Sequence, residues 1–139
     1  MPEPLKLDTV FLIDDDETVN FLNTVIIKST GLIKNITAVS SAENALQELA
    51  LRRNGNSWPG ILFVDINMPK INGWEFLDQF RIQFKEYKNK CLVCMLSSSL
   101  DPRDQLMVNN SDIADFFIPK PLTVEAVSDL YHKYMELTS

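Results

Sequence analysis

Short runs of hydrophobic residues recur along the chain and predict β-strands. The four clearest runs are residues 10–13, 61–64, 92–96 and 116–118, and a weaker fifth run, residues 36–39, lies between the first two. The clear runs do not alternate with polar residues, which is typical of strands that helices cover on both faces. The pattern therefore predicts a parallel β-sheet at the centre of the protein.

Between these runs, hydrophobic residues recur at spacings of three and four, which indicates amphipathic α-helices. A helix that follows Asp101 has the weakest hydrophobic face. We interpret each of the other four faces as packing against the core and not as a binding surface. These faces consist of Val19, Leu22 and Ile26; Ala42, Ala45 and Leu49; Leu77, Phe80, Phe84 and Tyr87; and Val124, Val127, Tyr131 and Tyr134.

Three helix starts carry capping signals. Ser40 and Glu43 have the spacing of a capping box, in which each side chain accepts a hydrogen bond from the other residue's backbone N–H. Asp101 precedes Pro102, a residue type that favours the first helical position, and Thr123 precedes the last helix. These signals set the predicted starts of three helices.

The resulting order of elements is (βα)5, which predicts a doubly wound, three-layer α/β sandwich with right-handed crossovers. We expect residues 1–139 to form one domain, with its core at about residues 7–137 and no output domain. In open sheets of this class, ligands bind beyond the carboxyl ends of the strands. Functional residues are therefore expected at those ends.

Composition and charge indicate a globular domain that does not bind nucleic acids or anionic membranes directly. Hydrophobic residues make up 45% of the chain and charged residues 23%, which is typical of a globular domain. Thirteen Lys and Arg residues against nineteen Asp and Glu residues give a net charge of -6, which disfavours direct binding to nucleic acid or to anionic membranes. The first residues lack a signal-peptide pattern and no hydrophobic run approaches the ~20 residues that span a bilayer, so we expect a cytoplasmic location.

Cys91 and Cys94 form a C-x-x-C sequence, which occurs in redox pairs and in zinc sites. Here both residues belong to a predicted buried strand, and side chains three positions apart on a strand point to opposite faces of the sheet. We therefore interpret them as two separate buried, apolar side chains.

Polar residues follow four of the predicted strands. Because the carboxyl ends of parallel strands share one edge of the sheet, we expect these side chains to converge. Neighbouring carboxylates repel one another unless a cation offsets their charge, and oxygen ligands at a shallow site favour Mg²⁺. A lysine and a hydroxyl beside them would contact further oxygens of a phosphoryl group. The residues are Asp14, Asp15 and Asp16 after the first strand, Asp65 after the third, Ser97 after the fourth and Lys120 after the fifth.

The acidic run of Asp14, Asp15 and Asp16 has a second interpretation, because such a run also caps a helix and complements its dipole. Asp65 is harder to explain in this way. It follows four hydrophobic residues, and a lone buried carboxylate is costly without a partner. The joint placement of these residues after successive strands favours a functional site.

Five segments of the sequence, taken together, carry a family resemblance. They are residues 11–16 (FLIDDD), residues 61–69 (ILFVDINMP), Asn72-Gly73, residues 95–98 (MLSS) and Lys120-Pro121. In this order, and over essentially the whole chain, they resemble the receiver domain of two-component response regulators. The resemblance implies a flavodoxin-like fold whose parallel strands lie in the order 2-1-3-4-5.

The resemblance also implies a metal site. Asp15 and Asp65 would bind Mg²⁺ directly, and Asp14 would act largely through water. The backbone carbonyl of Asn67 would complete the protein ligands. Mn²⁺ would be able to replace Mg²⁺ at such a site.

Phosphoryl transfer is the chemistry that the resemblance implies. Asp65 would accept the phosphoryl group of a histidine kinase or a histidine phosphotransfer protein and become an aspartyl phosphate. Ser97 and Lys120 would contact the phosphoryl oxygens, with a cis peptide bond before Pro121 aiming Lys120 inward. Ser97 and Phe117 would form the conformational switch, although Phe117 lacks the hydroxyl of the Tyr that is common in the family.

We therefore expect a stand-alone response regulator in a phosphorelay, which catalyses only its own phosphorylation and dephosphorylation and signals by contact with a downstream protein. Two alternatives stay open. A haloacid-dehalogenase-type phosphatase would use Asp14 as its nucleophile, because residues 14–18 read D-x-D-x-T, but only scattered acidic residues follow Lys120 where that family needs a cluster. The other alternative is a phosphorylation-independent binding module on the same fold.

Overall fold

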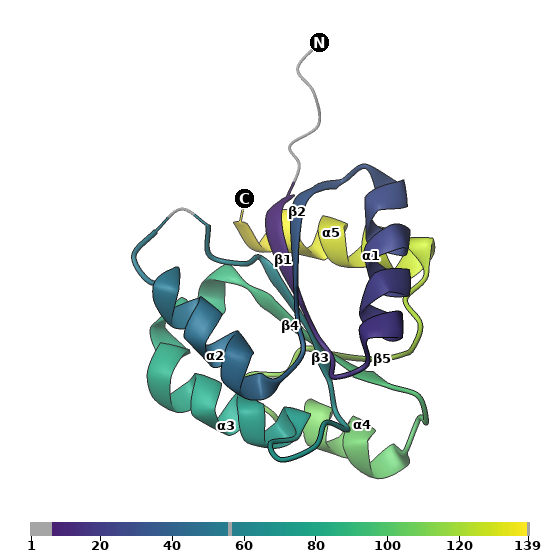
Figure 1. The fold of residues 1–139 in the computed structure, drawn as a ribbon. Coiled ribbons are helices and arrows are strands. Elements are labelled where there is room, and N and C mark those ends of the chain that lie inside the picture. Colours follow the sequence, from purple (N-terminus) through teal and green to yellow (C-terminus); the bar gives the residue numbers. More distant parts are fainter. Residues whose placement is uncertain (1–6, 56, 139) are drawn as a thin grey trace.

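The computed structural model describes residues 7–55 and 57–138, which form a five-stranded parallel sheet and its covering helices (Figure 1). The strands lie in the order β2-β1-β3-β4-β5, so the predicted α/β class and strand order are confirmed. The elements are β1 (Leu7–Ile13), α1 (Glu17–Thr30), β2 (Ile33–Val39), α2 (Ala42–Leu51), β3 (Ile61–Asp65), α3 (Gly73–Phe84), the 3-10 helix η1 (Lys85–Lys90), β4 (Leu92–Ser97), α4 (Pro102–Asn109), β5 (Phe116–Pro119) and α5 (Val124–Thr138).

The helices cover both faces of the sheet: α1 and α5 lie on one face, and α2, α3 and α4 lie on the other (Figure 1). Neighbouring residues of β1 show why the strands are continuous hydrophobic runs in the sequence: both faces of the sheet are covered by helices. Phe11 packs in the cluster under α2 and α3, Leu12 packs in the cluster under α1 and α5, and both are fully buried. Within the described residues, the helices are too short or too polar to cross a membrane.

The two cysteines have the predicted arrangement. Cys91 packs in the cluster under α3, and Cys94 packs in the cluster on the opposite face of the sheet. Both thiols are free and buried. Burial raises the pKa of Cys91 to about 12 and also raises the pKa of Cys94, so neither is a reactive thiolate or a ready metal ligand at neutral pH.

The predicted core face of α1 is only partly right: Val19 is half-buried and Ile26 packs against the core, but Leu22 does not. Leu22 is 48% exposed, whereas the helix buries Asn20, Asn23 and Ile27. The helix is thus turned by one residue, about 100°, from the orientation that its hydrophobic pattern predicts. Both asparagines bond to backbone groups outside the helix, and these hydrogen bonds offset part of the cost of burying two polar side chains. Asn20 Oδ1 is buried without a hydrogen-bond partner among the described residues.

Two of the three predicted helix starts are confirmed. Asp101 accepts a hydrogen bond from the N–H of Arg103 at 2.9 Å, where α4 begins with a proline. The hydroxyl of Thr123 accepts from the N–H of Ala126 at 3.1 Å, where α5 begins.

The predicted capping box of Ser40 and Glu43 is wrong by one residue. Ser41 is the N-cap of α2, and its hydroxyl accepts from the N–H of Asn44 at 3.1 Å. Two adjacent serines offer the same capping group, so their sequence alone did not distinguish which one starts the helix.

The α3 helix ends earlier than predicted, and its start carries a cap that was not predicted. It ends at Phe84, so Tyr87 lies in η1, where its ring stacks on Trp58 at a centroid distance of 4.5 Å. At its start, Asn72 and Glu75 form a reciprocal capping box that the sequence analysis missed.

Candidate functional site

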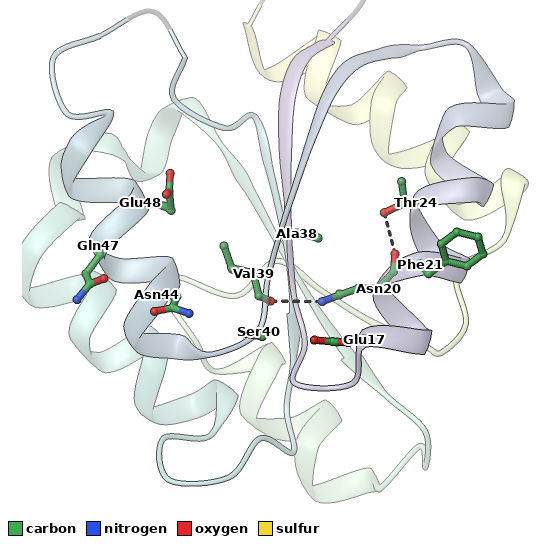
Figure 2. Close-up of a pocket in the computed structure, with 10 residues that line it drawn as sticks. All are labelled: Glu17, Asn20, Phe21, Thr24, Ala38, Val39, Ser40, Asn44, Gln47 and Glu48. Atoms are coloured by element: carbon green, nitrogen blue, oxygen red, sulfur yellow. Dashed lines mark hydrogen bonds between the residues drawn. The ribbon is translucent and has the colours of Figure 1, made fainter.

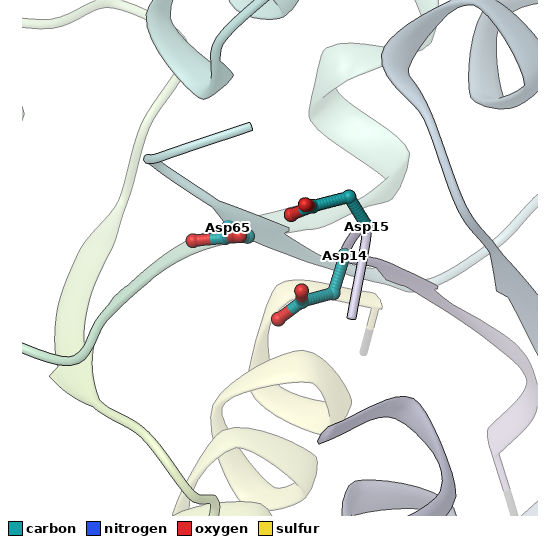
Figure 3. A group of neighbouring side chains, drawn as sticks. All are labelled: Asp14, Asp15 and Asp65. Carbon is teal, nitrogen blue, oxygen red and sulfur yellow. The ribbon is translucent and has the colours of Figure 1, made fainter. Parts of the chain in front are cut away.

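Three carboxylates meet at the carboxyl edge of the sheet. Asp14 directly follows β1, Asp65 is the last residue of β3, and these two strands are neighbours. One carboxylate oxygen from each of Asp14, Asp15 and Asp65 lies within 4.8 Å of the others. Figure 3 shows the three side chains at the ends of the two strands. The predicted convergence of these residues is confirmed.

Each residue of the acidic run has a different environment. Asp14 is 2% exposed, and its Oδ1 accepts from the N–H of Asp16 at 2.9 Å. Asp15 is exposed. Asp16 is the N-cap of α1 and accepts from the N–H groups of Thr18 and Val19. The helix-capping interpretation therefore holds for Asp16, whereas the side chains of Asp14 and Asp15 do not cap α1.

The backbone around Asp65 is closely packed. Asp65 is 2% exposed, and its Oδ1 accepts from the N–H of Asn67 at 3.1 Å. Gly73, the first residue of α3, donates its N–H to the carbonyl of Ile66 at 2.9 Å. A Cβ atom at position 73 would lie 2.6 Å from the carbonyl oxygen of Asp65, so only glycine fits there. The sequence analysis noted Gly73 only as part of the family resemblance.

Lys120 joins the two buried carboxylates. Its Nζ lies 3.1 Å from Asp14 Oδ2 and 3.4 Å from Asp65 Oδ1. Its backbone N–H donates to the carbonyl of Ser97 at 2.9 Å, which ties the end of β5 to β4. Burial alone would lower the pKa of Lys120, but the charges and hydrogen bonds of Asp14 and Asp65 outweigh it and raise that pKa above its ordinary value.

The pKa of Asp65 is raised to about 6. Burial is the largest cause, and the neighbouring charge of Asp14 adds to it. The N–H of Asn67 and the ammonium of Lys120 act in the opposite direction. The carboxylate of Asp65 is therefore ionised at neutral pH, but its environment makes the negative charge costly without a further cation.

The donor set fits a small, hard dication. Three carboxylates and one ammonium leave two uncompensated negative charges when all four groups are ionised. Carboxylate oxygens of this kind, partly open to water through Asp15, are the ligands that Mg²⁺ prefers. The residues that the family resemblance assigned to the metal therefore suit Mg²⁺ by charge and by donor type.

Ser97 is the last residue of β4, and Phe117 lies in the neighbouring strand β5. Ser97 is fully buried, and its hydroxyl donates to the carbonyl of Ser99 and accepts from the N–H of Ser99 at 3.1 Å. Phe117 is half-buried and packs against the cluster under α3. The roles assigned to these two side chains, and to the backbone carbonyl of Asn67, stay predictions.

Two hollows lie beside α1. A cavity of about 370 Å³ opens next to Lys120 and is lined by Asp16, Val19, Leu22 and Ser98 among others. A larger groove of about 530 Å³ runs between α1, the end of β2 and α2 (Figure 2). The three clustered carboxylates are not among the residues that line either hollow, but the smaller one reaches Lys120 and so adjoins the site.

The sequence analysis missed Asn20 and Asn23, the two buried asparagines of α1. Asn20 Nδ2 donates to the carbonyl of Asp14 at 2.9 Å, and Asn23 Oδ1 accepts from the N–H of Leu122 at 3.0 Å. Their spacing of three residues places both on one helix face, and this spacing was the available signal. This signal was overlooked because Val19 and Leu22, one position earlier, have the same spacing and are hydrophobic.

Comparisons with known proteins agree with this geometry. A family model described as the response regulator receiver domain matches residues 10–132. A crystal structure of a two-component response regulator from Cytophaga hutchinsonii is 49% identical, with a TM-score of 0.91, and the match covers 94% of this chain and 98% of that one. A two-component response regulator from Legionella pneumophila is 29% identical, with a TM-score of 0.74, over 94% of this chain and 99% of that one.

One curated relative is a much longer protein. The sensor histidine kinase CheAY of Helicobacter pylori is 27% identical over 128 residues, which are 92% of this chain. The match spans only 15% of the length of that kinase, so the similarity concerns one part of it.

Proposed function

The chain belongs to the response regulator receiver family, and from this premise we propose that it is a phosphorylation-dependent signalling switch whose phosphoryl acceptor is Asp65. The observation that carries the proposal is the position of Lys120, whose ammonium contacts both Asp14 and Asp65. A buried cation that bridges two carboxylates at the end of the central strands is suited to a phosphoryl oxygen.

In the proposed reaction, one carboxylate oxygen of Asp65 attacks the phosphorus atom of a phosphohistidine. The O–P bond forms as the N–P bond breaks, and the electron pair of that bond returns to the imidazole nitrogen. Although its pKa is raised to about 6, the carboxylate of Asp65 is still largely ionised at neutral pH and can act as a nucleophile. Lys120 is placed to release Asp65 and to pair with a phosphoryl oxygen, while it keeps its contact with Asp14.

Asp14, Asp15 and Asp65 would hold Mg²⁺, with the backbone carbonyl of Asn67 as a further ligand. When bound, the ion neutralises the negative charge that gathers on the transferred group. The hydroxyl of Ser97 would leave the carbonyl of Ser99 and donate to a phosphoryl oxygen. This rotation would also free the loop that leads to α4, so it would connect phosphorylation to a change of surface.

The phosphoryl donor would be a histidine kinase or a histidine phosphotransfer protein. Phe21, Leu22 and Val25 are exposed hydrophobic residues of α1, and Leu22 also lines the cavity beside Lys120. A donor that covered this face would bring its histidine to the edge of the site. The downstream partner would be a protein that recognises the changed surface near α4 and Phe117.

The phosphatase alternative is disfavoured by the position of Asp16. In a D-x-D-x-T phosphatase site, the second aspartate acts beside the nucleophile, but here Asp16 is occupied as the N-cap of α1. The binding-module alternative makes a different prediction, because it requires no phosphoryl uptake. The proposal that the chain catalyses only its own phosphorylation and dephosphorylation is part of the leading function and is tested with it.

The test is incubation with acetyl phosphate, with and without Mg²⁺, followed by intact mass measurement and peptide mapping. We expect one phosphoryl group on Asp65 that requires Mg²⁺, and none on Asp65→Asn. Asp15→Asn is the matched control for the metal, since it should weaken the dependence on Mg²⁺ without removing the acceptor. Label on Asp14 with rapid turnover would support the phosphatase, and a protein that stays unlabelled under all conditions would support the binding module.

A further inference from the structure

The buried side of α1 carries two asparagines one turn apart, and each bonds to a loop of the candidate site. Asn20 is 8% exposed, and its Nδ2 donates to the carbonyl of Asp14 at 2.9 Å. It also donates to the carbonyl of Val39 at 3.4 Å, a bond that Figure 2 shows. The first of these bonds fixes the backbone of Asp14 in the loop of residues 14–16, which we call the acidic loop. The second joins that loop to the end of the edge strand.

Asn23 is 1% exposed, and its Oδ1 accepts from the N–H of Leu122 at 3.0 Å. Pro121 has no N–H, so the N–H of Leu122 is the first backbone donor after Lys120. The N–H of Lys120 itself bonds to the carbonyl of Ser97. Two hydrogen bonds, one from β4 and one from α1, therefore hold the backbone on both sides of the Lys120 side chain.

The orientation of α1 is not the one that would bury most of its hydrophobic side chains. The helix buries two amides on the face that meets the sheet and α5, and it leaves Phe21 and Leu22 exposed at 66% and 48%. A hydrophobic core would favour the opposite choice. Buried polar groups that break the local hydrophobic pattern are expected where function requires them. Here Asn20 bonds to the loop that carries the negative charge of Asp14, and Asn23 bonds to the loop that carries the positive charge of Lys120.

We propose that Asn23 is a positioning residue that holds Lys120 against Asp14 and Asp65. Asn20 holds the acidic loop, so that the carboxylate of Asp14 lies within reach of the Lys120 ammonium. Asp14 and Lys120 are 106 residues apart in the sequence, and α1 is the element that bonds to the loops of both. The helix thus sets the separation between the ammonium and the carboxylates. The expected effect on phosphoryl transfer rests on the proposed function of Asp65.

The central variant is Asn23→Leu, which keeps the number and branching of the side-chain heavy atoms and removes the acceptor. We expect the rate of phosphorylation by acetyl phosphate at saturating Mg²⁺ to fall about tenfold or more, since small misplacements of a catalytic group have effects of this size. Ile27→Val is the control: it trims a fully buried side chain of the same helix, and it should leave the rate unchanged. Asn23→Ala repeats the test if the leucine is not accommodated.

A double-mutant cycle with Lys120→Ala distinguishes an effect of Asn23 on the position of Lys120 from a general disturbance of the fold. If Asn23 acts through Lys120, then Asn23→Leu should change the rate less than twofold in the Lys120→Ala background. An equal loss in both backgrounds would overturn the proposal. A single-variant rate equal to that of the wild type would overturn it as well.

A crystal structure of Asn23→Leu gives a readout that does not depend on phosphorylation. We expect Lys120 Nζ to move beyond hydrogen-bond distance of Asp14 or Asp65. If the wild type takes up no phosphoryl group, the proposed function fails, but this structure still judges the positioning role. An unchanged Lys120 in the variant would contradict that role even if the protein is phosphorylated normally.

Discussion

The ammonium of Lys120 lies 3.1 Å from the Oδ2 of Asp14, and the side chain of Asp14 is 3% exposed and that of Lys120 14% exposed. Removing the cation would leave Asp14 and Asp65 as neighbouring buried carboxylates without a positive partner. The loss of one partner from a buried ion pair is strongly destabilising, because the remaining charge is uncompensated.

We therefore expect Lys120→Met to lower the free energy of unfolding by about 2–4 kcal/mol at pH 7 in the absence of Mg²⁺. Urea denaturation measures this difference. Saturating Mg²⁺ should restore a large part of the stability, because a bound dication replaces the missing charge. Lys34→Met is the matched control, because Lys34 is an exposed residue of β2, and it should change the stability by less than about 0.5 kcal/mol.

Asp65 should make stability depend on pH in the opposite sense from an ordinary ion-paired carboxylate. Its pKa is about 6 in the folded protein, against an ordinary value of 3.8. Between these values the folded protein binds more protons than the unfolded chain, so stability falls as the pH rises through this window. We expect Asp65→Asn to be more stable than the wild type by roughly 1–3 kcal/mol at pH 7 without Mg²⁺.

Thermal or urea unfolding from pH 4 to pH 8 tests this expectation. The gain of Asp65→Asn should be small near pH 4, grow up to about pH 6 and then level off, following the pKa of the wild-type carboxyl. Mg²⁺ should stabilise the wild type more than the variant, because the variant lacks one of the three carboxylates. An Asp65→Asn protein that is less stable than the wild type at pH 7 would contradict the cost assigned to this charge.

The site was predictable because its residues follow hydrophobic runs that are unambiguous. Residues 61–64 can only be a buried strand or part of a buried helix, and their short length decides for a strand. Once the sheet is parallel, Asp14, Asp65 and Lys120 must share an edge. The shared edge followed from the parallel sheet, and the strand order came from the family resemblance. The contact of Lys120 with Asp14 itself was not predicted.

The orientation of α1 was not predictable in the same way. Its hydrophobic residues favour one face, and the observed face is stabilised by hydrogen bonds from Asn20 and Asn23 to loops distant in the sequence. Such bonds depend on where other elements lie, so a local pattern does not contain them. The hydroxyl of Ser97 is a similar case, because its partner Ser99 depends on the conformation of the loop after β4.

Gly73 should not tolerate a side chain. A Cβ atom at this position would lie 2.6 Å from the carbonyl oxygen of Asp65 and 2.9 Å from the Cα of Ile66, both of them backbone atoms. We expect Gly73→Ala to lower the free energy of unfolding by about 1–3 kcal/mol, although alanine is the better helix former. Gly55→Ala is the control, since its Cβ would meet a single atom, at 3.4 Å, and denaturation of the two variants should separate them clearly.

Trp74 connects the start of α3 to α4. Its indole N–H donates to Asp104 Oδ1 at 3.0 Å, and it directly follows Gly73, which packs on the backbone of Asp65. The α4 helix buries only Val108, so few other contacts hold it. We therefore expect the bond between Trp74 and Asp104 to make a large contribution to the local stability of α4.

Asp104→Ala should increase the hydrogen-exchange rates of the α4 amides about fivefold or more, as expected for the loss of a hydrogen bond to a charged group. The exchange of the β3 and β4 amides should stay unchanged. Gln105→Ala is the matched control, because Gln105 bonds only to Asn109 within the same exposed helix face. If both variants loosen α4 equally, the helix is held by its own propensity, and the contact with Trp74 does not couple it to the loop of Asp65.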